Sequence, residues 1–312
     1  DTYVVGTGDS VYESGTGTDW IVTSANLTLA TNVEGAFLTS GADSVIGNAS
    51  NNTLTAAGLG SAVTLDGGAG ADTVVGDTGD DSLLGGTDSV KDSLVGGAGN
   101  DTYVVGALDV VVEGSGADVD WVITSAGITL ADNVEGLSLS GGASVVGTSL
   151  ANTLTAAGLG SAVTLDGGAG ADTLIGGGMA DSLLGGTDSD VDSLVGGAGN
   201  DTYVVGSGDV VVEASGADVD WVITSAGITL DANVEGLSLS GGAHVTGNAS
   251  NNTLTAVGLS SAVTLDGAGG DDTLLGGSQG DSLVGGTGTD SLVGGDGSDT
   301  YVCLLYTSDA AD

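Results

Sequence analysis

The segment "GGTGTDSLVGGDGSDTYV" (Gly285–Val302) is one nine-residue phrase written twice. Each copy reads Gly-Gly-x-Gly-x-Asp-x-apolar-x. Glycine tolerates positive φ and lets the backbone approach a ligand, so three glycines in six residues predict a tight turn with exposed carbonyls. The aspartate that closes the turn adds a carboxylate. Short runs with alternating apolar residues are typical of strands, so the phrase predicts a repeated turn and strand.

This phrase belongs to a longer repeat. "DTYVVG" begins at Asp1, Asp101 and Asp201, which divides the sequence into three units of about a hundred residues, 1–100, 101–200 and 201–302. Each unit carries a run of aspartates nine residues apart, with a two-residue insertion in the first two units. These aspartates are Asp72, Asp81, Asp92, Asp101, Asp172, Asp181, Asp192, Asp201, Asp272, Asp281, Asp290 and Asp299. Repetition at such periods indicates a solenoid.

The same spacing continues between the aspartate runs. Asn52, Asn152 and Asn252 take the aspartate's place two residues before a leucine, where an amide can hydrogen-bond between stacked turns without charge. Short runs such as "DWVITS" and "SAVTL" are typical of strands, and the frequent glycines exclude long helices. We therefore predict an all-β fold, a single solenoid of stacked parallel strands that extends over residues 1–302.

The composition requires a positive partner. The chain has 42 acidic residues, of which six are Glu, one Lys, no Arg and a formal net charge of −41. Such charge opposes compaction, yet 40% of the residues are apolar, too many for an acidic disordered tail. The sign of the charge excludes nucleic acid and argues against an anionic membrane surface. No apolar run reaches the roughly 20 residues of a membrane-spanning helix.

The ligand types select the cation. Carbonyl and carboxylate oxygens in adaptable geometry, six to eight per ion, are what Ca²⁺ takes, whereas Mg²⁺ demands a small octahedron and keeps its waters. Zinc and copper prefer imidazole or thiolate, and the chain has one His and one Cys. We therefore predict several bound calcium ions.

The nonapeptides "GGTGTDSLV", "GGDGSDTYV", "GGAGADTLI" and "GGAGNDTYV" resemble the RTX (repeat-in-toxin, haemolysin-type) calcium-binding repeat. The resemblance extends over residues 1–302. It implies an all-β, right-handed parallel β-roll or β-helix solenoid in which two successive nonapeptides form one coil. Calcium would be held between turns on the same side by glycine carbonyls and by two aspartates. The implied aspartate pairs are Asp72/Asp92, Asp81/Asp101, Asp172/Asp192, Asp181/Asp201, Asp272/Asp290 and Asp281/Asp299. The implied glycine ligands include Gly277, Gly286, Gly288, Gly295 and Gly297.

Some turns depart from the motif. "GDTGDD" lacks a glycine, "GGGMAD" has Met179 in a glycine position, "GGSQGD" shifts one glycine, and "DGAGGDD" disrupts its leading pair. The inserted turns before Asp92 and Asp192 are expected to bulge and to bind calcium weakly. The third block, from Asp272 to Asp299, is the strongest calcium candidate.

Other conspicuous residues are assigned to packing. Trp20, Trp121 and Trp221 recur once per unit, and a packing role at a wide coil is favoured over a sugar-stacking ladder. Tyr103, Tyr203 and Tyr301 occupy the apolar position and are expected to widen the core. With one His, one Lys and no Arg, carboxylates are the only plausible acid–base groups, so we expect no enzyme activity.

The last ten residues, "CLLYTSDAAD" (Cys303–Asp312), break the repeat. They resemble the translation of a transposase-type sequencing adapter and are expected not to form a domain. The chain is therefore interpreted as a fragment of a larger protein.

The RTX resemblance implies a secreted or cell-surface bacterial protein exported by a type I secretion system. Extracellular calcium modules bind at about 10⁻⁴–10⁻³ M, which would keep the chain unfolded in the cytosol and fold it outside. Three functions stay open: a calcium-triggered folding module attached to an effector, a repetitive adhesin or surface stalk whose fold is largely calcium-independent, and a non-catalytic module of a secreted protease, lipase or polysaccharide-modifying enzyme.

Overall fold

The computed structural model describes residues 1–56 and 58–302, and these residues form 31 short β-strands without a helix. The predicted all-β parallel solenoid is confirmed. The chain divides into two compact units, Asp1–Leu154 and Thr155–Asp312. The division into three units of about a hundred residues each stays a prediction. The last ten residues, 303–312, which resemble a sequencing adapter, lie outside the described residues. Within the described part, no helix could cross a membrane.

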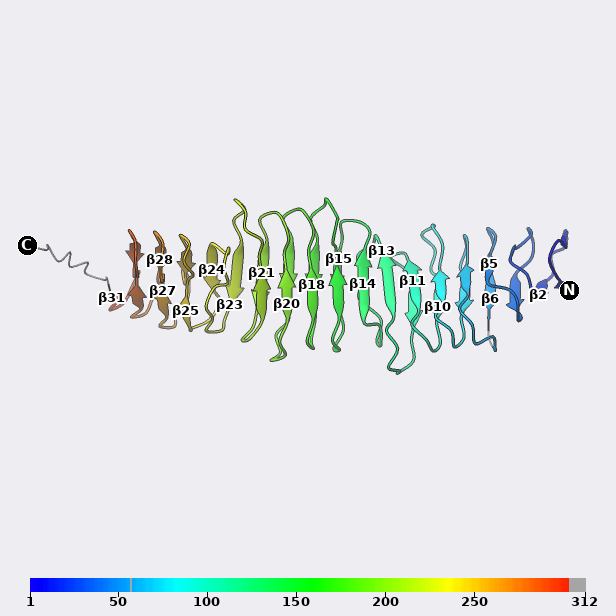
Figure 1. The fold of residues 1–312 in the computed structure, drawn as a ribbon, viewed down its shortest axis with the longest axis horizontal. Helices are drawn as coiled ribbons and strands as arrows, with labels where there is room; N and C mark the ends of the chain where they lie inside the picture. Colours follow the sequence, from blue (N-terminus) through cyan, green and yellow to red (C-terminus); the bar gives the residue numbers. More distant parts are fainter. Residues whose placement is uncertain (57, 303–312) are drawn as a thin grey trace, which may run out of the picture. The chain divides into compact units, whose positions relative to one another are not determined.

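The first unit contains β1 to β15 and the start of β16, and fourteen of these strands lie in two parallel sheets, β1-β2-β4-β6-β8-β10-β12 and β3-β5-β7-β9-β11-β13-β14. Figure 1 shows them stacked side by side. Their bounds are β1 (Thr2–Val5), β2 (Trp20–Thr23), β3 (Leu27–Thr28), β4 (Gly35–Leu38), β5 (Ser44–Ile46), β6 (Thr53–Thr55), β7 (Thr64–Asp66), β8 (Thr73–Val75), β9 (Ser82–Leu84), β10 (Ser93–Val95), β11 (Thr102–Val105), β12 (Val110–Val112), β13 (Trp121–Thr124), β14 (Gly136–Leu139), β15 (Ser144–Val146) and β16 (Thr153–Thr155), which includes the boundary.

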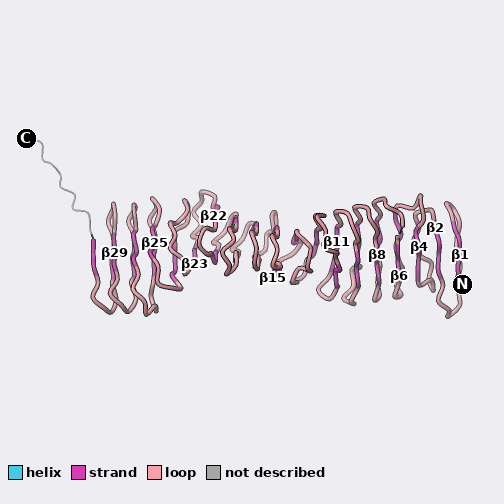
Figure 2. Tube along the Cα trace, turned by 90° about the horizontal axis from the view of Figure 1, so that it is seen from below, coloured by secondary structure: helices cyan, strands magenta, loops and turns pink. Residues whose placement is uncertain are grey.

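The second unit repeats this architecture, and Figure 2 shows its short strands joined by loops. Its strands pair in the orders β17-β19-β21-β23-β24-β26-β28-β30, β18-β20-β22 and β25-β27-β29-β31. Their bounds are β17 (Thr164–Asp166), β18 (Thr173–Ile175), β19 (Ser182–Leu184), β20 (Ser193–Val195), β21 (Thr202–Val205), β22 (Val210–Val212), β23 (Trp221–Thr224), β24 (Gly236–Leu239), β25 (His244–Thr246), β26 (Thr253–Thr255), β27 (Thr264–Asp266), β28 (Thr273–Leu275), β29 (Ser282–Val284), β30 (Ser291–Val293) and β31 (Thr300–Val302).

The register follows the nine-residue repeat. In the nonapeptide blocks successive strands alternate between two sheets, so a strand pairs with the strand two repeats later. Thr273 pairs with Ser291, and Thr73 pairs with Ser93 where the insertion lengthens the coil. Two nonapeptides therefore form one coil, as the resemblance implies.

The core is a row of single apolar side chains. In most three-residue strands the middle residue is buried and its two neighbours are half-buried, with a Thr or Ser before it and often a Leu, Ile or Val after it. Leu83, Leu94 and Leu174 are fully buried, and each such burial contributes roughly 1.5–3 kcal/mol. Tyr103 and Tyr203 are also fully buried, which confirms their core position, whereas Tyr301 in the last described strand is 52% exposed.

The tryptophans pack against a neighbouring coil. Trp121 pairs with Gly136, and a Cβ atom added to Gly136 would lie 2.5 Å from the indole ring. Trp221 stands in the same relation to Gly236. The ring lies over backbone that only glycine leaves open, which supports the packing role.

Candidate metal-binding turns

Glycine is required in the turns because of both their dihedral angles and their stacking. Gly286, Gly288, Gly295 and Gly297 have φ of 92°, 135°, 94° and 124°, a region that side chains disfavour. A Cβ atom at Gly295 would also overlap the Gly277 carbonyl of the preceding coil. Four of the five predicted glycine ligands therefore have the expected turn conformation, and Gly277 contributes a closely stacked carbonyl.

The predicted aspartates form buried ladders along each unit. Their Oδ1 atoms accept the backbone N–H of the aspartate one coil earlier, for example from Asp72 to Asp92 at 2.8 Å and from Asp181 to Asp201 at 2.7 Å. The same bond joins all six predicted pairs. Ten of these side chains are only 1–3% exposed: Asp72, Asp81, Asp92, Asp101, Asp172, Asp181, Asp192, Asp201, Asp272 and Asp281. Asp290 and Asp299 are half-buried.

The second carboxylate oxygen has one of two environments. At Asp81, Asp181 and Asp281, Oδ2 accepts a backbone N–H of its own turn at 2.6–2.8 Å. At Asp72 and Asp272, Oδ2 is buried without a hydrogen-bond partner. An unsatisfied buried polar atom costs about 1–3 kcal/mol, and more when it is charged.

These partnerless oxygens border a space that glycine keeps open. A Cβ atom at Gly67 would lie 2.5 Å from Asp72 Oδ2 and 2.8 Å from the Gly85 carbonyl oxygen. At Gly267 it would overlap Asp272 Oδ2 and lie 2.6 Å from the Gly285 carbonyl oxygen. A carboxylate oxygen and a carbonyl oxygen converge there, which is the type of ligand that Ca²⁺ takes. The residues fit calcium.

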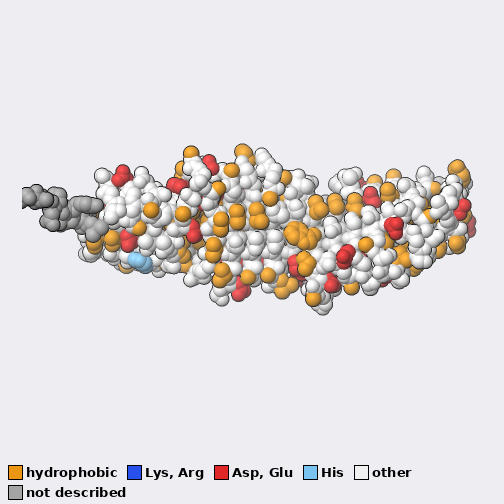
Figure 3. Space-filling view, in the orientation of Figure 1, with side chains coloured by type: hydrophobic (Ala, Val, Ile, Leu, Met, Phe, Trp, Pro, Cys, Tyr) orange, Lys and Arg blue, Asp and Glu red, His pale blue; other side chains and the backbone are white. Residues whose placement is uncertain are grey.

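The electrostatics also require a neutralising partner. Burial, followed by neighbouring carboxylates, raises the pKa of Asp272 to about 6 and that of Asp101 to about 7. The chain's one lysine, Lys91, lies in an exposed insertion, and no lysine or arginine is seen on the face drawn in Figure 3. Charge compensation at neutral pH must therefore come from protons or from bound cations.

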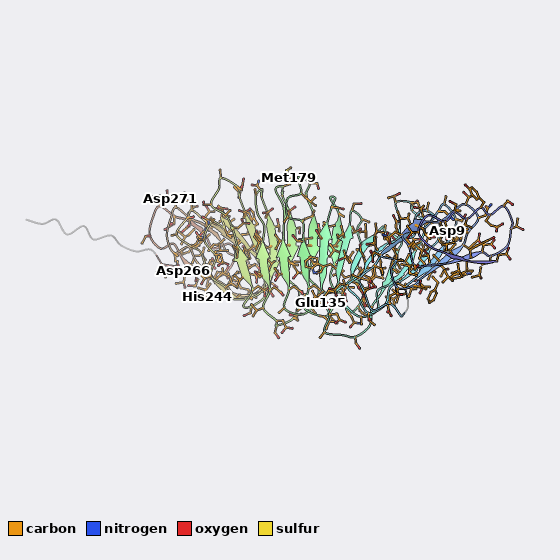
Figure 4. All side chains as sticks on the ribbon, turned by 45° about the vertical axis from the view of Figure 1, so that its right-hand side comes forward. Asp9, Glu135, Met179, His244, Asp266 and Asp271 are labelled. Carbon is orange, nitrogen blue, oxygen red and sulfur yellow. The ribbon has the colours of Figure 1, made fainter. Side chains whose placement is uncertain are left out.

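The departures from the motif have visible consequences. Residues 87–91 form an exposed loop, as the predicted bulge requires, while Asp92 stays in the buried ladder; weak calcium binding there stays a prediction. Met179 is 48% exposed on a loop outside the strands (Figure 4). Ala268 takes a glycine position with φ of 68°, so its turn is strained.

The asparagine positions need no ion. Asn52 Oδ1 accepts the Asn48 N–H at 2.7 Å, and its Nδ2 donates to the Val33 carbonyl at 3.0 Å. Asn252 makes the same two bonds with Asn248 and Val234. The predicted uncharged hydrogen bonding between turns is confirmed.

The structure also brings predicted aspartates together with acidic residues that the sequence analysis did not single out. Asp101, Glu113 and Asp120 each offer an oxygen within 4.8 Å of the others, and so do Asp201, Glu213 and Asp220. A third group is Asp1, Glu13 and Asp19. The available sequence signal was the recurrence of these spacer acids once in every hundred residues.

The fold and the turns together define a calcium-binding parallel β-roll. The family described as "RTX calcium-binding nonapeptide repeat (4 copies)" matches residues 37–58, 64–89, 91–108, 164–192, 180–212, 246–283 and 266–301, more than half of the chain. The chain therefore belongs to the RTX calcium-binding repeat family. No curated protein matches it.

Proposed function

We propose that this chain is the calcium-dependent folding module of a larger secreted bacterial protein. The observation that carries the proposal is the buried aspartate ladder, in which oxygens such as Asp72 Oδ2 and Asp272 Oδ2 lack a partner beside a glycine carbonyl. Calcium bound there would supply the positive charge that the protein lacks. Binding free energy then becomes folding free energy, since the unfolded chain holds no preformed site.

The working range follows from the proposed location. RTX repeats occur generally in secreted bacterial proteins. Extracellular modules bind calcium at about 10⁻⁴–10⁻³ M, far above cytosolic levels, so the chain would stay unfolded before export and order afterwards. Export by a type I secretion system is part of the proposal. We further propose that the module is non-catalytic and is attached to an effector domain. A secreted protease, lipase or polysaccharide-modifying enzyme would be such an effector.

A second candidate function is an adhesin or surface stalk with a largely calcium-independent fold. The asparagine turns favour it, because Asn52 and Asn252 satisfy their amides without an ion. In such a protein the length of the solenoid would be the function.

A calcium titration of the full chain, followed by far-UV circular dichroism, separates the two. The folding module predicts a cooperative coil-to-β transition near millimolar calcium that equimolar magnesium does not produce. A complete β spectrum in chelator would refute it and support the stalk. Folding at micromolar calcium would refute folding delayed until export.

A further inference from the structure

In the nonapeptide turns, an aspartate oxygen and a glycine carbonyl of the next coil face the same glycine. Beside Gly96, Glu113 takes the place of that carbonyl. A Cβ atom at Gly76 would overlap Asp81 Oδ2 and lie 2.6 Å from the Gly96 carbonyl oxygen. One coil later, a Cβ atom at Gly96 would overlap Asp101 Oδ2 and lie 2.6 Å from Glu113 Oε1. A glutamate oxygen thus replaces the carbonyl where the nonapeptides end.

The second unit shows the same substitution. At Gly176 the two oxygens are Asp181 Oδ2, at 2.6 Å from the added Cβ, and the Gly196 carbonyl. At Gly196 they are Asp201 Oδ2 and Glu213 Oε1, the latter at 2.7 Å. The arrangement therefore recurs with each hundred-residue repeat.

A second aspartate completes each cluster. Asp120 is 3% exposed and accepts the Asp101 N–H through Oδ1 at 2.8 Å. The Asp120 backbone N–H donates to Glu135 Oε2 at 2.9 Å, and this bond holds the start of β13 in place. Asp220 makes the corresponding bonds at 2.7 Å and 3.0 Å. The aspartates before β13 and β23 are thus fixed against those before β11 and β21.

An orphaned oxygen within each cluster independently indicates a ligand. Asp101 Oδ2 and Asp201 Oδ2 belong to side chains that are 1% exposed, and neither atom has a hydrogen-bond partner. Both border the glycine-held space that Glu113 Oε1 or Glu213 Oε1 also borders. The tyrosine hydroxyl at the same space, of Tyr103 or Tyr203, donates to that glutamate.

We propose that Glu113 and Glu213 each complete a calcium site that ends a row of nonapeptide turns, Glu113 with Asp101 and Asp120, and Glu213 with Asp201 and Asp220. Three carboxylates converge in each, and a hard cation with adaptable oxygen coordination suits them. Because ligand charge raises calcium affinity, these sites fill before the nonapeptide turns. Glu113 and Glu213 both lie outside the matched repeats 91–108 and 180–212. Only the choice of calcium as the ion rests on the proposed function.

The test is a pair of double variants in the full chain. Glu113→Gln with Glu213→Gln removes one charge from each site and keeps an acceptor for the tyrosine hydroxyl. Asp118→Asn with Asp218→Asn removes the same charge from the same spacers, outside the clusters. Bound calcium is counted by equilibrium dialysis over rising calcium, and tyrosine near-UV difference spectra report the site locally.

We expect the wild-type chain and the asparagine control to bind equal numbers of ions. In both, the first ions to bind should change the tyrosine spectrum. The glutamine variant should bind two fewer ions and lose that signal. Equal binding by the glutamine variant and the control would overturn the proposal. If the glutamine variant fails to fold by circular dichroism, Asp120→Asn with Asp220→Asn tests the same sites.

The outcomes also separate this inference from the proposed function. If the wild-type chain binds only the ions that the glutamine variant loses, the nonapeptide turns are empty and the proposed function fails while this inference stands. If the glutamine variant loses no ions but still folds on calcium, this inference fails while the proposed function stands.

Discussion

Acid should substitute for calcium in folding this chain. Asp101 has an ordinary pKa of 3.8 when unfolded, and burial, followed by neighbouring carboxylates, raises its pKa in the folded state to about 7. The folded state therefore binds protons more tightly than the unfolded state, so the free energy of unfolding rises as the pH falls from about 7 toward 4. This direction is opposite to ordinary acid denaturation.

The size of the effect follows from linkage. A shift of about three pKa units corresponds to roughly 4 kcal/mol for Asp101 alone. The same cause raises the pKa of Asp92, Asp201 and Asp272 to about 6 and that of Glu213 to about 7. These groups interact, so their contributions do not simply add. The contribution of Asp101 alone is already a large part of the stability of a typical domain, about 5–15 kcal/mol.

The assay is far-UV circular dichroism with urea unfolding in chelator, from about pH 8 to about pH 4.5. We expect β structure to increase as the solution becomes more acidic. At limiting calcium the pH dependence should reverse, because protons compete with the cation for the same oxygens. Asp101→Asn should weaken the acid response. A calcium-free chain that is equally or less structured near pH 5 than near pH 8 would refute the reasoning.

Two further predictions concern single turns, and urea unfolding measures both. Ala268→Gly should raise the free energy of unfolding by about 1 kcal/mol in saturating calcium by relieving the positive φ, and Gly168→Ala at the equivalent position (φ 97°) should lower it by at least as much; shifts of the same sign would contradict the turn geometry. Asp272→Asn should raise stability in chelator by about 1–3 kcal/mol, because asparagine already serves at Asn252 in the same ladder. It should also reduce the gain on adding calcium, and an unchanged gain would argue against a ligand role for Asp272.

Much of the fold could be predicted because one short phrase specifies several levels of structure. The apolar residue two positions after each aspartate becomes the inward side chain of a strand, as Leu274 and Leu283 do. Two phrases make one coil, so aspartates 18 to 20 residues apart become neighbours, and Asp281 bonds to Asp299. The spacing of the aspartates along the sequence therefore also determines which of them become hydrogen-bond partners.

The spacer acids could not be predicted in this way. Asp120 lies 19 residues after Asp101, about one coil, but Glu113 follows Asp101 by 12 residues, which matches no multiple of the repeat. Its carboxylate reaches Asp101 only because β12 and β13 pair with different strands of the preceding turns. The role of Oδ2 was also not predicted: Asp72, in the regular turn "GGAGAD", keeps an Oδ2 atom without a partner, whereas Asp81, in the departing turn "GDTGDD", accepts the Asp77 N–H through Oδ2.

The asparagine and aspartate turns differ in whether the fold itself satisfies their side chains. Asn52 satisfies its amide within the fold, whereas Asp72, which accepts the Asn52 N–H at 2.7 Å, keeps a buried oxygen without a hydrogen-bond partner. In a solenoid each coil contacts mainly its neighbours, and order can spread from any stable part. Coils around Asn52 and Asn252 would then present a paired edge onto which the aspartate coils add as calcium binds. The folding module and the stalk are in that case two regimes of one mechanism, set by the ratio of asparagine to aspartate coils.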